Sequence, residues 1–211
     1  DLLWFVAGKT GFLQAFTHVL DRYVKQEPDP REVLACIVAM GTNMGLGKMA
    51  EVSGLGFASL LSTARNFLRL ETLREANDAI SNAIATLPAF HLFDIQDEIH
   101  SSSDGQRLET QIDTFNARHS PKYFGLDKGV SACTVVANHV PLNTKVIGAH
   151  EHESHYVFDL LYNNTSDIRP NRHSTDTHCT NQVNFWIVYA FGYQFAPRYR
   201  DLYKRIGSLV G

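Results

Sequence analysis

The stretch HSSSDGQRLET, from His100 to Thr110, begins the part of the chain whose sequence is typical of β-structure. Three serines, an aspartate and a glycine come together, and residues of alternating character follow them. Asp104 has two interpretations. Asp104 and Gly105 as a pair are typical of the tight turn of a β-hairpin. A carboxylate among small hydroxyl residues is also compatible with a metal site.

After Pro88 the sequence is rich in Val, Ile, Thr and aromatic residues, with breaks at Gly and Pro. This composition predicts about three neighbouring strands, which we expect to be antiparallel. The segments concerned are FHLFDIQDEIH (90–100), GQRLETQIDTFNARHS (105–120), KYFGLDKGVSACTVVANHV (122–140) and TKVIGAH (144–150).

Helices and short strands alternate in the rest of the chain. ESHYVFDLLYNN (153–164) has helical spacing, RHSTDTH (172–178) is typical of a short strand, and NQVNFWIVYAFG (181–192) predicts a buried helix that ends at its final glycine. YQFAPR (193–198) predicts one more strand and YRDLYKRI (199–206) one more helix. This order predicts an α/β fold in which helices flank a mixed sheet.

From Arg31 to about Leu87 the sequence has helical periodicity. Apolar residues recur at helical spacing, with polar residues on the opposite face, in REVLACIVAMGTNMG (31–45), GFASLLSTARNFL (56–68) and LETLREANDAISNAIATL (70–87). We therefore expect two regions, a helical lead-in over residues 1–88 and a sheet-containing region over residues 89–211.

Composition and charge restrict the possible functions. The chain has 211 residues, 44% of them hydrophobic and 19% charged, which predicts a globular core rather than a disordered chain. Its net charge of −3 argues against a module that binds nucleic acid by bulk positive charge alone. Three cysteines without a CxxC pair favour a reducing compartment. No apolar run approaches the roughly 20 residues that span a bilayer, and the first residues do not resemble a signal peptide.

Three motifs resemble functional sites but are better explained otherwise. The histidines of AHEHESHY (149–156) lack the spacing of a zinc helix, and Glu151 and Glu153 suit the first turn of a helix. GTNMGLGKM (41–49) lacks the first glycine and the final hydroxyl of a phosphate-binding loop, so its glycines predict a turn between helices. The glycosylation-like triplets within NNTSD (163–167) fit a polar loop.

Two aspartates remain as candidates for chemistry. Asp104 in SSSDGQ and Asp176 in HSTDTH are 72 residues apart, and small or hydroxyl residues flank both. If their strands are neighbours, both carboxylates can point into one crevice at the sheet edge, where oxygen ligands suit Mg²⁺ or Mn²⁺. The alternative is that Asp104 lies in a hairpin turn and that Asp176 caps the helix that follows it.

At these residues the sequence resembles a known family, the catalytic region of the Tn-three-type replicative transposases of bacteria. The resemblance covers roughly residues 31–206, including the helical segments GTNMGLGKMAEVSG (41–54) and LREANDAI (73–80). Six segments in order carry it: SSSDGQR (101–107), NARHSPKYFGLDKGV (116–130), NTKVIGAH (143–150), VFDLLYNNTSDI (157–168), HSTDTHCTNQV (173–183) and FGYQFAPRYRDL (191–202).

The resemblance implies an RNase H-like catalytic core with an Asp-Asp-Glu (DDE) triad that binds two Mg²⁺ ions, with Mn²⁺ as a substitute. Asp104 would be the first carboxylate and Asp176 the second, both catalytic and metal-binding. Asp94 and Asp97 are rivals for the first place but lie outside the matching motif. In the family the glutamate comes from a helix well downstream of FAPR, so we expect it outside this chain, which reads as a piece of a longer protein.

The resemblance also implies an activity. It predicts metal-dependent DNA strand cleavage and strand transfer in replicative transposition, with transposon-end and target DNA as partners and no membrane. It implies a homo-oligomer, a dimer, for the full-length protein and a cytoplasmic, nucleoid-associated location in bacteria. Without the third carboxylate, we expect this piece alone to be inactive. The alternative is a non-catalytic remnant or interaction domain on an RNase H-like scaffold.

Overall fold

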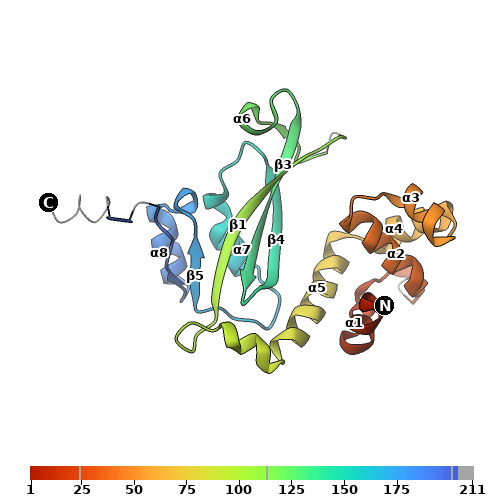
Figure 1. Cartoon of the computed structure of the whole chain (residues 1–211), viewed down its shortest axis with the longest axis horizontal. Helices are drawn as coiled ribbons and strands as arrows, with labels where there is room; N and C mark the ends of the chain where they lie inside the picture. Colours follow the sequence, from red (N-terminus) through yellow and green to blue (C-terminus); the bar gives the residue numbers. More distant parts are fainter. Residues whose placement is uncertain (24, 113, 201, 204–211) are drawn as a thin grey trace. The chain divides into compact units, whose positions relative to one another are not determined.

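The structure is a computed structural model that describes residues 1–23, 25–112, 114–200 and 202–203. The chain divides into two compact units, Asp1–Ala83 and Ile84–Gly211. Figure 1 gives the labels of the main helices and strands. Among the described residues, no helix is long and apolar enough to cross a membrane.

The first unit is helical. Its elements are α1 (Leu2–Thr10), η1 (Phe12–Ala15), η2 (Asp21–Tyr23), α2 (Pro30–Gly41), α3 (Leu46–Ser53), α4 (Phe57–Phe67) and α5 (Leu70–Ala85), the last of which continues into the second unit. Two apolar clusters form its interior, one around Phe12, Phe16 and Val33 and one around Cys36 and Leu60. The helical prediction for this region is therefore confirmed.

Local signals in the sequence set the helix ends of this unit. Asp29 precedes α2 and accepts a 2.8 Å hydrogen bond from the backbone N–H of Arg31, while Pro30 occupies the first helical position. Gly45, with φ of 78°, lies in the turn between α2 and α3. Gly45 thus lies in the predicted interhelical turn, because a positive φ favours glycine, whereas Gly41 ends α2 and Gly47 lies within α3.

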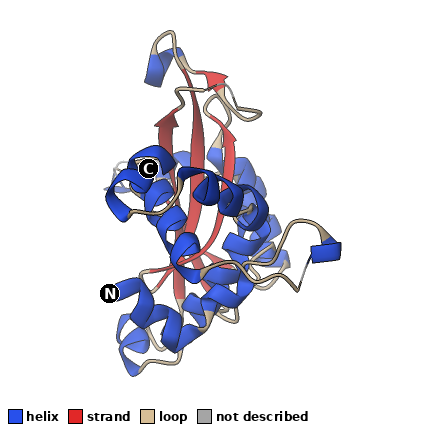
Figure 2. Ribbon diagram, turned by 90° about the vertical axis from the view of Figure 1, so that its right-hand side faces the viewer, coloured by secondary structure: helices blue, strands red, loops and turns tan. Residues whose placement is uncertain are grey.

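The second unit is built on a six-stranded sheet. Its elements are η3 (Pro88–Phe93), β1 (His100–Glu109), β2 (Arg118–His119), α6 (Pro121–Phe124), β3 (Lys128–Ala137), β4 (Val140–Gly148), η4 (Glu153–Tyr156), α7 (Val157–Tyr162), β5 (Arg172–Thr175), η5 (Thr177–Cys179), α8 (Gln182–Ala190) and β6 (Gln194–Phe195). Figures 1 and 2 show its long strands lying side by side along much of their length.

The strand order and directions are those of the RNase H-like fold, which confirms the fold class. β1 and β4 pair antiparallel with β3, and β5 pairs parallel with β1 on its other side. β6 continues the sheet parallel to β5, and the short β2 pairs with one end of β3. The chain passes through α7 between β4 and β5 and through α8 between β5 and β6, as parallel connections require.

Several features differ from the prediction, among them the helix α6 at the start of the predicted strand 122–140 and the helix α8, of which only Asn184 and Val188 are buried. Residues 90–99 do not form a strand of the sheet: Pro88 starts the 3₁₀ helix η3, and β1 begins only at His100. The predicted strand 122–140 in fact contains a hairpin turn, in which Asn138 and His139 have φ of 46° and 67°. Two consecutive residues with positive φ join antiparallel strands tightly. Residues 201 and 204–206 of the predicted helix 199–206 lie outside the described residues.

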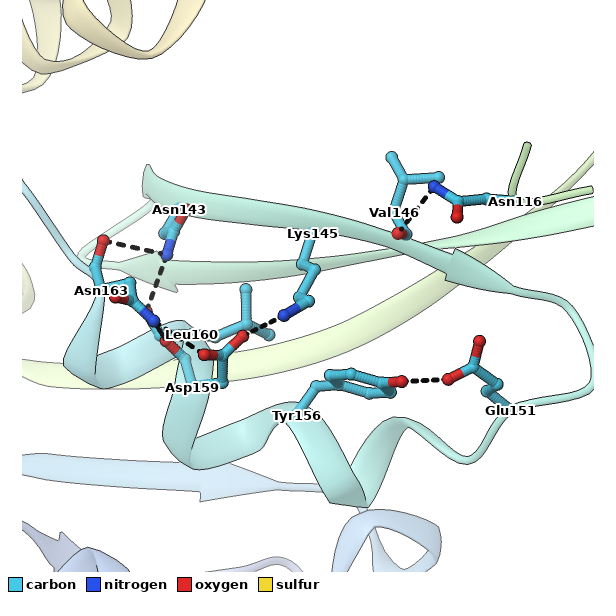
Figure 3. A network of polar contacts seen from close by, with 9 residues as sticks. All are labelled: Asn116, Asn143, Lys145, Val146, Glu151, Tyr156, Asp159, Leu160 and Asn163. Atoms are coloured by element: carbon cyan, nitrogen blue, oxygen red, sulfur yellow. Dashed lines mark hydrogen bonds and ion pairs between the residues drawn. The ribbon is translucent and has the colours of Figure 1, made fainter. Parts of the chain in front are cut away.

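The core of the second unit lies between the sheet and the helices α7 and α8. Side chains from β3, β4, α7 and α8 form one buried cluster; its members include Cys133, Val135, Leu142, Ile147, Val157, Leu160 and Val188. Figure 3 shows how polar contacts tie α7 to β4. Asn143 donates to the carbonyl oxygen of Leu160 at 2.9 Å, and Lys145 pairs with Asp159. These contacts hold α7 against the sheet that carries Asp104.

Candidate active site

Asp104 lies in the middle of β1, at the centre of the sheet. It pairs with Thr134 of β3, and the preceding residue, Ser103, also pairs with Thr175 of β5. The hairpin-turn interpretation is therefore wrong, because backbone pairing with β3 runs unbroken from Ser101 to Glu109. The Asp104 side chain is exposed, and its Oδ1 accepts a 2.8 Å hydrogen bond from the N–H of Gly105.

Asp176 follows the last residue of β5. It caps η5, where its Oδ1 accepts a 2.9 Å hydrogen bond from the N–H of Cys179. The predicted cap exists, but it belongs to η5; α8 is capped by Asn181 instead. The Asp176 side chain is exposed. A cap uses one lone pair of the carboxylate and leaves the second oxygen available for another ligand.

The parallel register of β1 and β5 brings the two aspartates together. Ser103 is opposite Thr175, so Asp104 and Asp176 come next on adjacent strands. Both line one cavity of about 550 Å³, together with Ser102, Ser103, Ser174, Thr175, Thr177, Arg198, Tyr199 and Arg200. The cavity therefore combines two carboxylates, several hydroxyl groups and two guanidinium groups.

A buried histidine joins β1 and β5 on the opposite face of these strands. The His173 ring is fully buried, with its Nδ1 2.8 Å from the Ser101 hydroxyl and its Nε2 3.0 Å from that of Ser103. Burial and, to a smaller extent, the nearby His100 lower the pKa of His173 from 6.5 to about 3. The neutral ring has one donor and one acceptor nitrogen, which suits two hydroxyl partners. This network fixes the strand pairing that places the two aspartates.

Glu153 is a second buried group near Asp104. Its side chain is only 11% exposed, and its Oε1 lies 3.2 Å from a guanidinium nitrogen of Arg107 and accepts a 3.0 Å hydrogen bond from Ser131. Arg107 also lies over the ring of Tyr123, 4.0 Å from its centroid. The sequence predicts only that Glu153 suits a helix N-terminus. It does lie in the first turn of η4, but its pairing across the sheet has no local sequence signal.

The rival aspartates have other roles. Asp94 lies 2.9 Å from the ring nitrogen of His91 and accepts a 2.6 Å hydrogen bond from Asn138, in the hairpin turn. These two hydrogen bonds outweigh burial and lower the pKa of Asp94. Asp97 has φ of 60° in the turn beside the isolated bridge between Ile95 and Glu98. Neither belongs to the set of residues lining the cavity.

The segment after β6 contributes residues that the sequence reasoning missed. Arg198, Tyr199 and Arg200 line the cavity, although FAPRYRDL has no spacing that marks a site by itself. The segment runs beside β5, where Ala196 N–H donates to the carbonyl oxygen of His173 and Arg198 N–H to that of Thr175, both at 2.8 Å. The sheet thus carries two arginines to the end of β5.

The histidine-rich segment forms no metal centre within the part of the chain that the structure describes. No group of three or more His, Cys, Asp or Glu side chains there could hold a metal ion. Glu151 accepts hydrogen bonds from the Tyr156 hydroxyl and the Gly148 N–H, which lower its pKa. The hydrogen bond between Tyr156 and Glu151 raises the pKa of Tyr156 to about 12 (Figure 3). His152 caps η4, as expected for a polar helix N-terminus.

Comparisons with known proteins identify the chain. The family described as Tn3 transposase DDE domain matches residues 1–210. The chain is 32% identical over 212 residues to the transposase for transposon Tn1546 of Enterococcus faecium, covering 96% of this chain. It is 34% identical over 206 residues to the transposase for transposon Tn501 of Pseudomonas aeruginosa, again over 96% of this chain. In both cases it spans 20% of the relative's length.

A solved structure, the Mos1 Strand Transfer Complex, is similar at 11% identity with a TM-score of 0.31, over 81% of this chain and 59% of that chain. The chain is a DDE domain of the transposase type. It belongs to the Tn3 transposase family, which confirms the resemblance of its motifs.

Proposed function

We propose that the second unit is the catalytic core of a replicative transposase, in which Asp104 and Asp176 hold divalent metal ions for DNA strand cleavage and strand transfer. One observation carries the proposal: two exposed carboxylates follow an aligned residue pair on adjacent parallel strands and line the same cavity. Such an arrangement at the carboxyl end of a strand is suited to a shared ligand.

The donors at this cavity fit a hard divalent cation. Mg²⁺ and Mn²⁺ prefer carboxylate oxygens, and the Oδ1 atoms of both aspartates are already oriented by backbone N–H groups. Bound metal ions would activate the attacking oxygen and stabilise the leaving one. Two carboxylates are fewer than the family's three, and we propose that a glutamate beyond residue 211 completes the set.

The chain's own residues would then have distinct roles. Asp104 and Asp176 bind the metal ions, and the surrounding hydroxyl groups provide a polar wall for a phosphodiester. His173 holds β1 and β5 in register, which fixes the spacing between the two carboxylates. We propose that the substrates are transposon-end and target DNA, that the full-length protein acts as a dimer, and that it acts at the bacterial nucleoid.

Calorimetric titration with Mn²⁺ tests the metal site. We expect the 211-residue chain to bind Mn²⁺, and Asp104→Ala and Asp176→Ala each to abolish most of that binding. Asp127→Ala is the matched control, because Asp127 is exposed and lies outside the cavity. Binding that persists in both cavity variants would refute the assignment. It would then favour a non-catalytic domain on an RNase H-like scaffold.

A further inference from the structure

The cavity that contains the two aspartates is lined by side chains of both charges. Asp104 and Asp176 contribute carboxylates, Arg198 and Arg200 contribute guanidinium groups, and all four side chains are exposed. Across the described part of the chain, no ion pair joins either arginine to an acidic side chain. In the described residues, neither guanidinium group is therefore held in an ion pair with a carboxylate.

The backbone that carries the arginines is fixed beside Asp176. The Thr177 hydroxyl donates to the carbonyl oxygen of Arg198 at 3.0 Å and accepts from the N–H of Arg200 at 2.7 Å. Arg198 N–H also donates to the carbonyl oxygen of Thr175 at 2.8 Å. Three hydrogen bonds thus attach residues 198–200 to the residues on either side of Asp176, so the position of the two guanidinium groups is tied to that of the carboxylate.

We propose that Arg198 and Arg200 bind the DNA phosphodiester backbone next to the phosphate that reacts at Asp104 and Asp176. This inference rests on the proposed function of that cavity. Guanidinium groups match phosphate geometry with paired hydrogen bonds, whereas carboxylates repel phosphate unless a metal ion lies between them. The cavity would therefore hold neighbouring parts of one DNA strand, directly at the arginines and through metal ions at the aspartates.

The proposed contact is independent of base sequence, because phosphate contacts position DNA without identifying bases. It also accounts for DNA binding by a chain whose net charge is −3. Such a chain has no bulk positive field to attract DNA, so two arginines at one cavity would supply a large share of its affinity. Each phosphate contact should then appear as a separate contribution to the salt dependence of binding.

Fluorescence anisotropy with a labelled oligonucleotide, single-stranded in one series and duplex in another, measures this contribution in Mn²⁺-containing buffer. We expect Arg198→Ala and Arg200→Ala each to weaken binding about tenfold at low salt. Each should also reduce the slope of log affinity against log salt by about 0.7 for the single strand or about 0.9 for the duplex. Arg200→Lys should retain the slope, because it retains the charge.

Arg169→Ala is the matched control. Arg169 is an exposed arginine of the same unit, located before the start of β5, whereas the cavity lies at the other end of that strand. We expect Arg169→Ala to bind the oligonucleotide as the parent chain does. Unchanged DNA binding in both cavity-arginine variants would overturn the inference, and so would an absence of detectable DNA binding by the parent chain.

Mn²⁺ titration of the arginine variants separates this inference from the proposed function. Normal Mn²⁺ binding with weakened DNA binding supports a direct phosphate contact. Loss of both would overturn the inference, because the arginines would then act by shaping the carboxylate site. Failure of the metal assignment itself would be seen in the aspartate variants, whatever the arginine variants do.

Discussion

The carboxyl group of Glu153 occupies the space beside Gly105 that a side chain would need. A Cβ placed on Gly105 would lie 2.1 Å from Cδ of Glu153, well inside van der Waals contact. The absence of a side chain at Gly105 therefore leaves room for the carboxyl end of Glu153, which comes from η4, and Gly105 does not form a turn. The residue after Asp104 is small because a buried acidic group packs against its backbone.

Gly105→Ala should destabilise the fold, because Glu153 must move away from Arg107 and Ser131. Because these contacts would be lost, we expect the free energy of unfolding to decrease by about 1–3 kcal/mol. Urea titration followed by circular dichroism measures this decrease. The matched control is Gly47→Ala, whose Cβ would have nothing within 4 Å in a helix; it should be neutral or slightly stabilising.

A double-mutant cycle checks the cause. In Glu153→Ala the obstructing carboxyl group is absent, so adding Gly105→Ala should cost less than it does in the parent chain. Strictly additive effects would contradict a direct clash between these two positions.

The buried His173 predicts a dependence of stability on pH. The folded-state pKa of about 3 is below the ordinary value of 6.5, so between these values the unfolded chain binds the proton and the folded chain does not. Stability should therefore be complete above about pH 6.5 and decline as the pH falls toward 3, by up to about 1.4 kcal/mol per pH unit.

Urea unfolding at pH 7 and pH 5 measures this effect, with His173→Gln as the comparison. The variant should lose less stability between the two pH values than the parent chain does. His100, whose pKa burial and Arg172 also lower, should leave a smaller residual dependence. An equal loss of stability in parent and variant would exclude His173 as the source.

The three cysteines should be unreactive in the folded chain. Burial raises the pKa of the Cys36 and Cys133 thiols to about 11 and raises that of Cys179 as well. The thiolate is the reactive form, so at pH 8 we expect negligible reaction with a chromogenic disulfide reagent in buffer. All three thiols should react in urea. Rapid reaction of one thiol in the folded chain would contradict the burial of that residue.

The 211-residue chain by itself should not cleave DNA. Among the described residues, only Asp104 and Asp176 contribute carboxylates to the cavity, whereas the family's site uses three. Incubation of a labelled duplex with Mg²⁺ or Mn²⁺, followed by gel electrophoresis, should show no metal-dependent products. Metal-dependent cleavage that Asp176→Asn abolishes would show that two carboxylates are sufficient.

Periodicity predicted much of the second unit. The antiparallel strands and the later alternation of helices and strands follow from local residue spacing, because one face of each element must be apolar. The boundary errors occurred where local signals were ambiguous. The aromatic residues of η3 resemble a strand, and the turn at Asn138 and His139 lacks the glycine that usually marks such a hairpin.

The site itself could be predicted only in part. The role of Asp104 depends on pairing with Thr134 and on the neighbouring strand β5, both distant in sequence. Glu153 of η4 also meets Arg107 of β1, without any local pattern in the sequence. The resemblance to the family predicted the two aspartates as site residues. It did not predict Arg198, whose place at the cavity depends on a backbone hydrogen bond to Thr175.

The contact of His173 with Ser101 and Ser103 has a consequence for how the protein folds. Side chains on a strand alternate between two faces, so a shift of β5 by one residue would separate the imidazole from both hydroxyl groups. A corresponding slip of β1 would turn Asp104 from solvent toward the apolar interior. Both errors leave a buried polar group without a partner and are strongly disfavoured. The histidine therefore favours the correct alignment of β1 and β5. Chains that fold with this alignment present both aspartates on the same side of the sheet.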